Sequence, residues 1–407
     1  MTKVQDRFLK YVSFDTQSDE RSETIPSTEK QKRLAEVLLA ELKEMGAKDA
    51  ELDENGYVYA TIPASAGSEG KPVLALVAHM DTAMDMSGKD VKPRIIENYD
   101  GNDIVLNEAL SIVTKTADFP VLKKYVGQDL IVTDGTTLLG ADDKAGAAEI
   151  MAVAERMLAG EIRHPEVRIV FTPDEEIGRG VAYINMDKVR ASYGYTVDGE
   201  EIGELEYENF NAASAAVTIH GVCVHPGASF GIMKNALLIA MEFHAMLPPF
   251  DTPATTTGRM GFFHLNNMEG KTETAELSYI IRDHDAGKLE ARKALMQSAA
   301  DYINQKYGEG TAEIKITDSY RNMYEQIVPD HEELIEYARE AIREAGIAPI
   351  EEPIRGGTDG ATLSYMGLPC PNLGTGGHAC HGRHEFIPIQ AMEKAVEILG
   401  NLAEKFA

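Results

Sequence analysis

The pattern of apolar and polar positions in the first half of the chain changes repeatedly between strand-like and helix-like periods. Residues 57–64 alternate, whereas residues 72–81, 166–180 and 193–200 each open with a short apolar run typical of a strand buried on both faces. Residues 31–45 carry apolar side chains at helical spacing, with Thr28 and Gln31 as a predicted capping box and Gly46 as the stop. This alternation predicts an α/β domain whose mixed, mostly parallel sheet is flanked by helices.

The order of strand-like and helix-like segments changes at about residue 211. Strand-like and helix-like segments then follow in the order β-α-β-β-α-β up to about residue 320. We therefore expect residues 211–320 to form a smaller α+β domain inserted into a larger one, which is built from residues 1–210 and 321–407.

Composition narrows the classes of protein and partner. The chain has 407 residues, of which 43% are hydrophobic and 26% charged, and its net charge is -27. An acidic chain of this kind argues against nucleic acids and anionic membranes as partners. The N-terminal residues lack the apolar core of a signal peptide, and Cys223, Cys370 and Cys380 are too few and scattered for a disulfide framework. We expect a cytoplasmic protein.

Acidic side chains collect just after the apolar runs. His79 and Asp81 follow the first, Glu175 and Glu176 the second, and Asp198 ends the third. Each pair alone is more often a cap or a solvated face, as is the Asp142–Asp143 pair at a predicted helix start. The carboxyl ends of parallel strands meet at one sheet edge, however, and clustered carboxylates there repel one another unless a divalent cation is present.

The segment HACHGRHEF, residues 378–386, offers a second group of candidate ligands. His378, Cys380 and His381 are too close in sequence to surround one tetrahedral ion easily, and no second Cys/His pair has zinc-finger spacing. This segment is therefore better interpreted as contributing a single ligand to a site assembled from distant residues.

The ordered motifs resemble those of the M20 family of metallopeptidases along essentially the whole chain. They include AHMDTAMDMSGK, LLGADDKAGAAEIM, FTPDEEIGRG, YTVDGEEIGELEYENFNAAS, VHPGASFG, PIRGGTDGA and HGRHEF. The resemblance implies an aminopeptidase that acts on tripeptides and holds two Zn²⁺ ions per subunit. A metal-bridging hydroxide would attack the peptide, and the inserted domain would act as a lid or in dimerisation.

The resemblance also implies a role for individual residues. Glu175 would be the general base, and Asp81 would orient and polarise the imidazole of His79. His225 would stabilise the oxyanion, Arg355 would meet the substrate carboxylate, and Arg282 is a weaker candidate for that contact. The implied metal ligands are His79 and Asp198 for one ion, Glu176 and His381 for the other, and Asp142 as the bridge between them.

Two other interpretations remain open. The chain could be another M20 hydrolase, such as a dipeptidase, a carboxypeptidase or an N-acyl amino acid deacylase. An aspartate at position 198 accompanies aminopeptidases and dipeptidases within the family, and the long motifs favour the tripeptide enzyme. The chain could also be a non-catalytic peptide- or metal-binding relative, although Glu175 has no ligand role to preserve. Nucleophilic catalysis has little support, because Cys223, Cys370 and Cys380 lie in no recognisable Cys/His motif of the protease type.

Overall fold

The computed structural model describes residues 2–407 and divides into two compact units. The first comprises Met1–Tyr207, Met323–Glu352 and Thr358–Ala407, and the second comprises Glu208–Asn322 and Pro353–Gly357. The short segment Pro353–Gly357 was predicted to belong to the larger domain. It belongs instead to the second unit, because Ile354 forms a β-bridge with Asn209 and Arg355 donates to two carbonyl groups of that unit.

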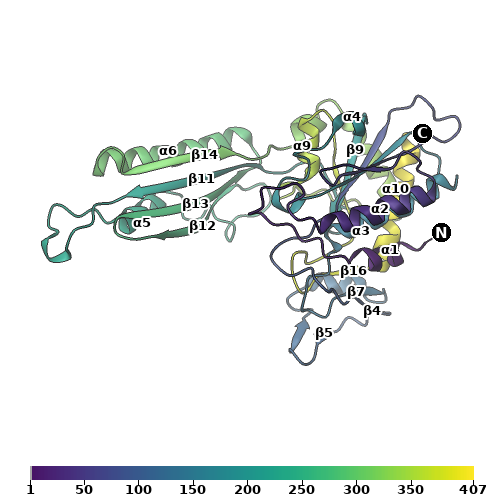
Figure 1. Ribbon diagram of the computed structural model, residues 1–407, viewed down its shortest axis with the longest axis horizontal. Helices are drawn as coiled ribbons and strands as arrows, with labels where there is room; N and C mark the ends of the chain where they lie inside the picture. Colours follow the sequence, from purple (N-terminus) through teal and green to yellow (C-terminus); the bar gives the residue numbers. More distant parts are fainter. Residues whose placement is uncertain (1) are drawn as a thin grey trace. The chain divides into compact units, whose positions relative to one another are not determined.

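The first unit is built on a seven-stranded mixed sheet (Figure 1). The pairs β8–β3, β3–β9 and β9–β15 are parallel, and the pairs toward both edges are antiparallel. This arrangement confirms the predicted α/β class. The strand order is β1 (Glu51–Leu52), β2 (Val58–Ile62), β8 (Val167–Thr172), β3 (Leu74–His79), β9 (Tyr193–Gly199), β15 (Asn372–Gly374), β10 (Leu205–Glu206).

Helices cover both faces of this sheet, as the fully buried strands require. Helix α3 (Ala141–Leu158) packs on β3 and contacts α1 (Val4–Tyr11) and α10 (Ile389–Lys405). The opposite face is covered by α4 (Met186–Val189) and α9 (Asp359–Tyr365), whose apolar residues join Val77 and Val170 in one core cluster. The unit also contains α7 (Tyr324–Ile327) and α8 (Glu332–Glu344).

Helix α2 (Gln31–Met45) begins differently from the prediction. Its N-cap is Lys30, which makes no side-chain capping bond, and the hydroxyl of Thr28 donates to the carbonyl of Gln17. The predicted capping box is therefore wrong, because both side chains have tertiary partners instead. The helix does end at Gly46, whose φ of 110° lies in the left-handed region that glycine favours.

A small β region, built mostly from residues between β3 and α3, was not anticipated from the sequence. The strands β4 (Arg94–Ile96), β7 (Leu130–Val132) and β16 (Phe386–Pro388) form an antiparallel sheet, and β5 (Ile104–Asn107) pairs with β6 (Ile112–Thr114). Their strands are only three or four residues long, too short for a clear periodic signal. The pairing of β16 with β7 anchors the end of the HACHGRHEF segment.

The second unit has the predicted β-α-β-β-α-β order (Figure 1). One face of its antiparallel sheet packs against both helices, so that Ala213, Ala215, Val217 and Ile219 are buried. The elements are β11 (Asn211–His220), α5 (Ala236–Ala245), β12 (Phe262–Gly270), β13 (Thr274–Asp283), α6 (Ala286–Tyr307) and β14 (Ala312–Asp318), with sheet order β12-β13-β11-β14. Among the described residues of the chain, no helix is both long enough and apolar enough to cross a membrane.

Candidate metal centre

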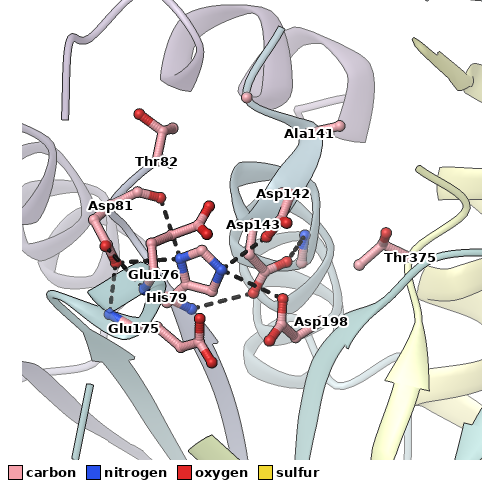
Figure 2. A network of polar contacts seen from close by, with 12 residues as sticks. His79, Asp81, Thr82, Ala141, Asp142, Asp143, Glu175, Glu176, Asp198 and Thr375 are labelled. Atoms are coloured by element: carbon pink, nitrogen blue, oxygen red, sulfur yellow. Dashed lines mark hydrogen bonds and ion pairs between the residues drawn. The ribbon is translucent and has the colours of Figure 1, made fainter. Parts of the chain in front are cut away.

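The carboxyl ends of three neighbouring parallel strands present the central residues of the candidate site (Figure 2). His79 is the last residue of β3, and Asp198 lies near the end of β9. Glu175 and Glu176 follow β8 in a short 3₁₀ turn, Glu175–Ile177. Because β8, β3 and β9 are adjacent and parallel, residues that are far apart in sequence meet at one edge of the sheet.

Asp142, at the start of α3, lies between two imidazoles. Its Oδ1 atom is 2.8 Å from Nε2 of His79, and its Oδ2 atom is 3.1 Å from Nε2 of His381. The φ/ψ angles of Asp142 and Asp143 are not helical, so the regular helix follows them. One carboxylate thus offers a different oxygen to each of two histidines, which is the arrangement expected of a shared ligand.

Two further acids complete the cluster. Oδ1 of Asp198 is 3.4 Å from Nε2 of His79, and Oε2 of Glu176 is 3.0 Å from Nε2 of His381. Ligand atoms of His79, Asp142 and Glu176 lie within 4.8 Å of one another, as do those of His79, Glu175 and Asp198. The structure therefore brings together all five residues predicted as metal ligands, and Glu175 lies beside them.

Asp81 contacts both the imidazole of His79 and the turn that carries Glu175 and Glu176. Nδ1 of His79 lies 3.3 Å from Oδ1 of Asp81 and 3.1 Å from its carbonyl oxygen, so a proton on Nδ1 leaves Nε2 free to face Asp142 and Asp198. The Asp81 carboxylate also accepts bonds from the backbone N–H groups of Glu175, at 3.0 Å, and Glu176, at 3.2 Å. The predicted contact with His79 is present, and the contacts with the turn were not foreseen.

Asp174 secures the same turn from the other side. Its φ of 58° lies in the left-handed region, which aspartate tolerates better than most residues. Its buried carboxylate accepts bonds from the backbone N–H of Ser27 at 2.6 Å, the hydroxyl of Ser27 at 2.5 Å and the side-chain amide of Gln31 at 2.6 Å. The sequence analysis did not single out Asp174, because its partners lie more than 140 positions away.

Asp143 supports the strand rather than the cluster of ligand atoms. Its Oδ2 atom accepts a bond from the backbone N–H of His79 at 3.1 Å, and its Oδ1 atom accepts one from Gly146 at 3.1 Å. Both contacts are with backbone N–H groups, one at the end of β3 and the other in α3. Asp143 therefore holds the backbone around the site.

The buried carboxylates of the cluster repel one another, and a nearby positive charge would stabilise their ionised forms. Burial, together with the charge of Asp142, raises the pKa of Glu176 to about 7, and burial raises the pKa of Asp198 to about 6. Burial likewise raises the pKa of Glu175 well above its usual value. Hydrogen bonds to Asp142 and then to Glu176 raise the pKa of His381 to about 11. In addition, the Oε1 atom of Glu176 is buried without a hydrogen-bond partner among the described residues.

The side chains of the cluster have the donor atoms that a pair of metal ions requires. Imidazole nitrogens and carboxylate oxygens are the donors that zinc prefers at catalytic sites. The unpartnered Oε1 of Glu176 and the mutual repulsion of the acids are both relieved by cations. The donor set therefore fits a pair of divalent ions.

The other residues of HACHGRHEF have structural partners. His378 is buried, with Nε2 2.6 Å from the hydroxyl of Tyr125, and Nδ1 of His384 lies 2.9 Å from the hydroxyl of Thr114. Cys380 is partly buried and forms no disulfide. His381 has a φ of 62°, an unusual value for a non-glycine residue that fits a constrained functional loop. Of the three imidazoles in this segment, His381 is the one whose ring contacts acidic side chains of the cluster.

The three predicted substrate-binding residues belong to the second unit. Nδ1 of the exposed His225 accepts a bond from the backbone N–H of Gly227 at 3.1 Å, so the neutral ring carries its proton on Nε2. Arg282 donates to the carbonyl groups of Ala213 and Ile281, and its guanidinium lies 5.1 Å from the ring centre of Tyr320. No ion pair of Arg282 with Asp283 is present; Asp283 pairs with Arg292.

Arg355 is held within the second unit by several contacts. It donates to the carbonyl groups of Gly258 and Met260 and to the hydroxyl of Thr256. Its guanidinium also lies over the rings of Phe210 and Phe262. These contacts engage Nη1 and Nη2 and give the planar group a defined orientation. Its role toward a substrate carboxylate stays a prediction.

Comparison with known proteins defines the class of the fold and the site. Residues 134–405 match the model of peptidase family M20/M25/M40, and the chain belongs to this family. Over 408 aligned residues it is 55% identical to Peptidase T of Caldanaerobacter subterraneus subsp. tengcongensis, covering 100% of this chain and 99% of that protein.

Two solved structures have the same fold. Aminopeptidase PepT from Bacillus cereus superposes with a TM-score of 0.79 at 23% identity, covering 99% of this chain and 98% of that one. A tripeptidase from Staphylococcus aureus superposes with a TM-score of 0.80 at 21% identity and the same coverage.

Proposed function

We propose that this protein is a two-metal aminopeptidase that releases the N-terminal residue of tripeptides. The observation that carries the proposal is the position of Asp142 between His79 and His381, with Glu175 at the same edge of the sheet. The names of the full-length relative at 55% identity and of the two solved structures support the choice of tripeptides as substrates.

The ions are assigned to the cluster by its donor atoms. His79 and Asp198 would hold one ion, Glu176 and His381 would hold the other, and Asp142 would contribute to both. We assign zinc to both positions from the mixture of nitrogen and oxygen donors. When bound, such a pair supplies Lewis-acid polarisation of the scissile carbonyl and lowers the pKa of water.

Glu175 moves the proton in this proposal. Burial keeps its pKa high, so that its carboxylate can take a proton from the attacking water and deliver it to the leaving amine. Asp81 holds the backbone N–H of Glu175 and thereby fixes where that carboxylate starts. Because Glu175 also lies within ligand distance of His79 and Asp198, its role and that of Glu176 need separate tests.

The substrate contacts are assigned to the second unit. The proton on Nε2 of His225 suits a donor to the oxyanion, and Arg355 is assigned to the substrate carboxylate, with Arg282 as the weaker candidate. The proposal also includes a lid or dimerisation role for this unit, a homodimer, short peptides rather than nucleic acids or membranes as partners, and a cytoplasmic location.

A substrate panel tests the proposed function. Purified protein loaded with Zn²⁺ is assayed on unblocked tripeptides, the same tripeptides with an acetylated N-terminus, dipeptides and N-acetyl amino acids. We expect fastest release of the N-terminal residue from unblocked tripeptides. Preferential cleavage of acetyl amino acids would indicate a deacylase instead, and no hydrolysis by protein that binds two ions would indicate a binding protein.

A further inference from the structure

The carboxylate of Glu385 closes around a row of backbone N–H groups in the turn that presents Asp142. Its Oε2 atom accepts bonds from Leu139 at 2.6 Å and Gly140 at 2.8 Å. Its Oε1 atom accepts bonds from Ala141 at 2.7 Å and Asp142 at 3.2 Å. Four successive N–H donors therefore converge on one side chain that is only 1% exposed.

This turn has no local means of satisfying its donors. Gly140 is the N-cap of α3 and has no side chain, and its φ of 83° turns the chain into the left-handed region. Successive N–H groups in such a turn form a concavity that favours an anion. Because a buried N–H without a partner is costly, Glu385 provides from more than 240 positions away what the local sequence lacks.

The same residue ties two predicted ligands together. Glu385 lies four positions after His381 and directly before β16, which pairs with β7. One end of this short segment therefore reaches Asp142 through its imidazole, and the other end holds the backbone of Asp142 through its carboxylate. Moving either end displaces the carboxylate that stands between the two histidines.

We propose that Glu385 is a positioning residue for the metal pair: it fixes the 139–142 turn so that Asp142 meets both His79 and His381. This inference rests on the proposed function, since it concerns the same metal centre. It assigns no catalytic step to Glu385, which touches backbone groups only among the contacts described above.

Glu385→Gln tests the inference with little change in size. Each carboxylate oxygen faces two N–H donors, so the amide NH₂ of glutamine must face donors on one side and can satisfy only half of the row. We expect Zn²⁺ affinity, measured by competition with a chelating dye on metal-stripped full-length protein, to fall about 10–100-fold. Both binding steps should weaken, because Asp142 is assigned to both ions.

Glu149→Gln is the matched control. Glu149 is a fully buried glutamate on the same helix α3, and neither of its carboxylate oxygens has a hydrogen-bond partner among the described residues. We expect this variant to bind Zn²⁺ as the wild type does. An equal loss of affinity in Glu149→Gln would show a general effect of removing a buried acid and would overturn the inference.

The remaining outcomes separate the inference from the proposed function. Two-ion binding by the wild type with unchanged affinity in Glu385→Gln would overturn the inference alone. No binding of Zn²⁺ by the wild type would overturn the proposed function. If Glu385→Gln does not fold, as judged by circular dichroism, Glu385→Asp replaces it. The carboxylate of aspartate is one methylene closer to its own backbone. We expect its Zn²⁺ affinity to fall in the same assay, by less than the fall expected for Glu385→Gln.

Discussion

Oδ1 of Asp142 and Nε2 of His79 lie 2.8 Å apart, although 63 positions separate the two residues in the chain. The second oxygen of the same carboxylate lies 3.1 Å from Nε2 of His381, which is 239 positions further on. Because the carboxylate of Asp142 contacts both imidazoles, its removal has consequences for both halves of the centre.

Asp142→Ala should lose both ions. Removing the shared carboxylate leaves His79 with Asp198 and His381 with Glu176, which are two incomplete ligand sets. We expect metal content, measured by inductively coupled plasma mass spectrometry after desalting, to fall from two ions per chain to nearly none. Retention of one full equivalent would show that the ions do not share Asp142.

Glu175→Gln should separate chemistry from metal binding. Glutamine cannot take the proton from water, so kcat on a tripeptide should fall by about 10²–10⁴-fold. Metal content should stay close to that of the wild type, because Glu175 is assigned no ion. The comparison variant is Glu176→Gln, which should lose metal as well as activity. Loss of metal in Glu175→Gln but not in Glu176→Gln would show that Glu175 is the metal ligand and Glu176 the general base.

Asp174→Asn should destabilise the turn that carries both glutamates. Asparagine tolerates the left-handed backbone at this position, but its amide NH₂ faces donors from Ser27 or Gln31. We expect the free energy of unfolding to fall by about 1–3 kcal/mol, as for a buried polar group left unsatisfied. Urea denaturation of metal-free protein measures this, and the exposed Asp187→Asn on α4 should change stability by less than about 0.5 kcal/mol.

His378 should make the folded state less stable in acid. Burial lowers the pKa of His378 to about 4, below the 6.5 that is usual for the unfolded chain. Between these values the unfolded state binds the extra proton, so stability decreases as the pH falls from about 6.5 to about 4. The side chain contributes a slope of up to one proton, about 1.4 kcal/mol per pH unit.

His378→Gln tests this slope, because glutamine does not titrate and can still contact the hydroxyl of Tyr125. Urea denaturation of chelator-treated protein at pH 7 and pH 5 should show a smaller loss of stability in the variant than in the wild type. Equal losses in the two proteins would contradict a neutral, buried His378.

Much of the fold was accessible from local sequence patterns. The apolar runs of β3 and β8 and the apolar stripe of α2 appear where the patterns place them, since burial on two faces and helical spacing are properties of short segments. The small strands β4 to β7 lacked such a signal, and the capping box at Thr28 failed because a tertiary partner competes for that hydroxyl.

The sequence by itself determined the longer strands, their order with the helices, the acids at the strand ends and, through its motifs, the family. These follow from residue type and short spacing. Only the tertiary structure decided which atoms meet: Asp142 with two imidazoles, Asp174 with Ser27 and Gln31, and Glu385 with the turn before α3. The physical reason is distance along the chain. Hydrogen bonds between segments more than 140 positions apart depend on how the sheet and its loops pack, which local periodicity does not encode.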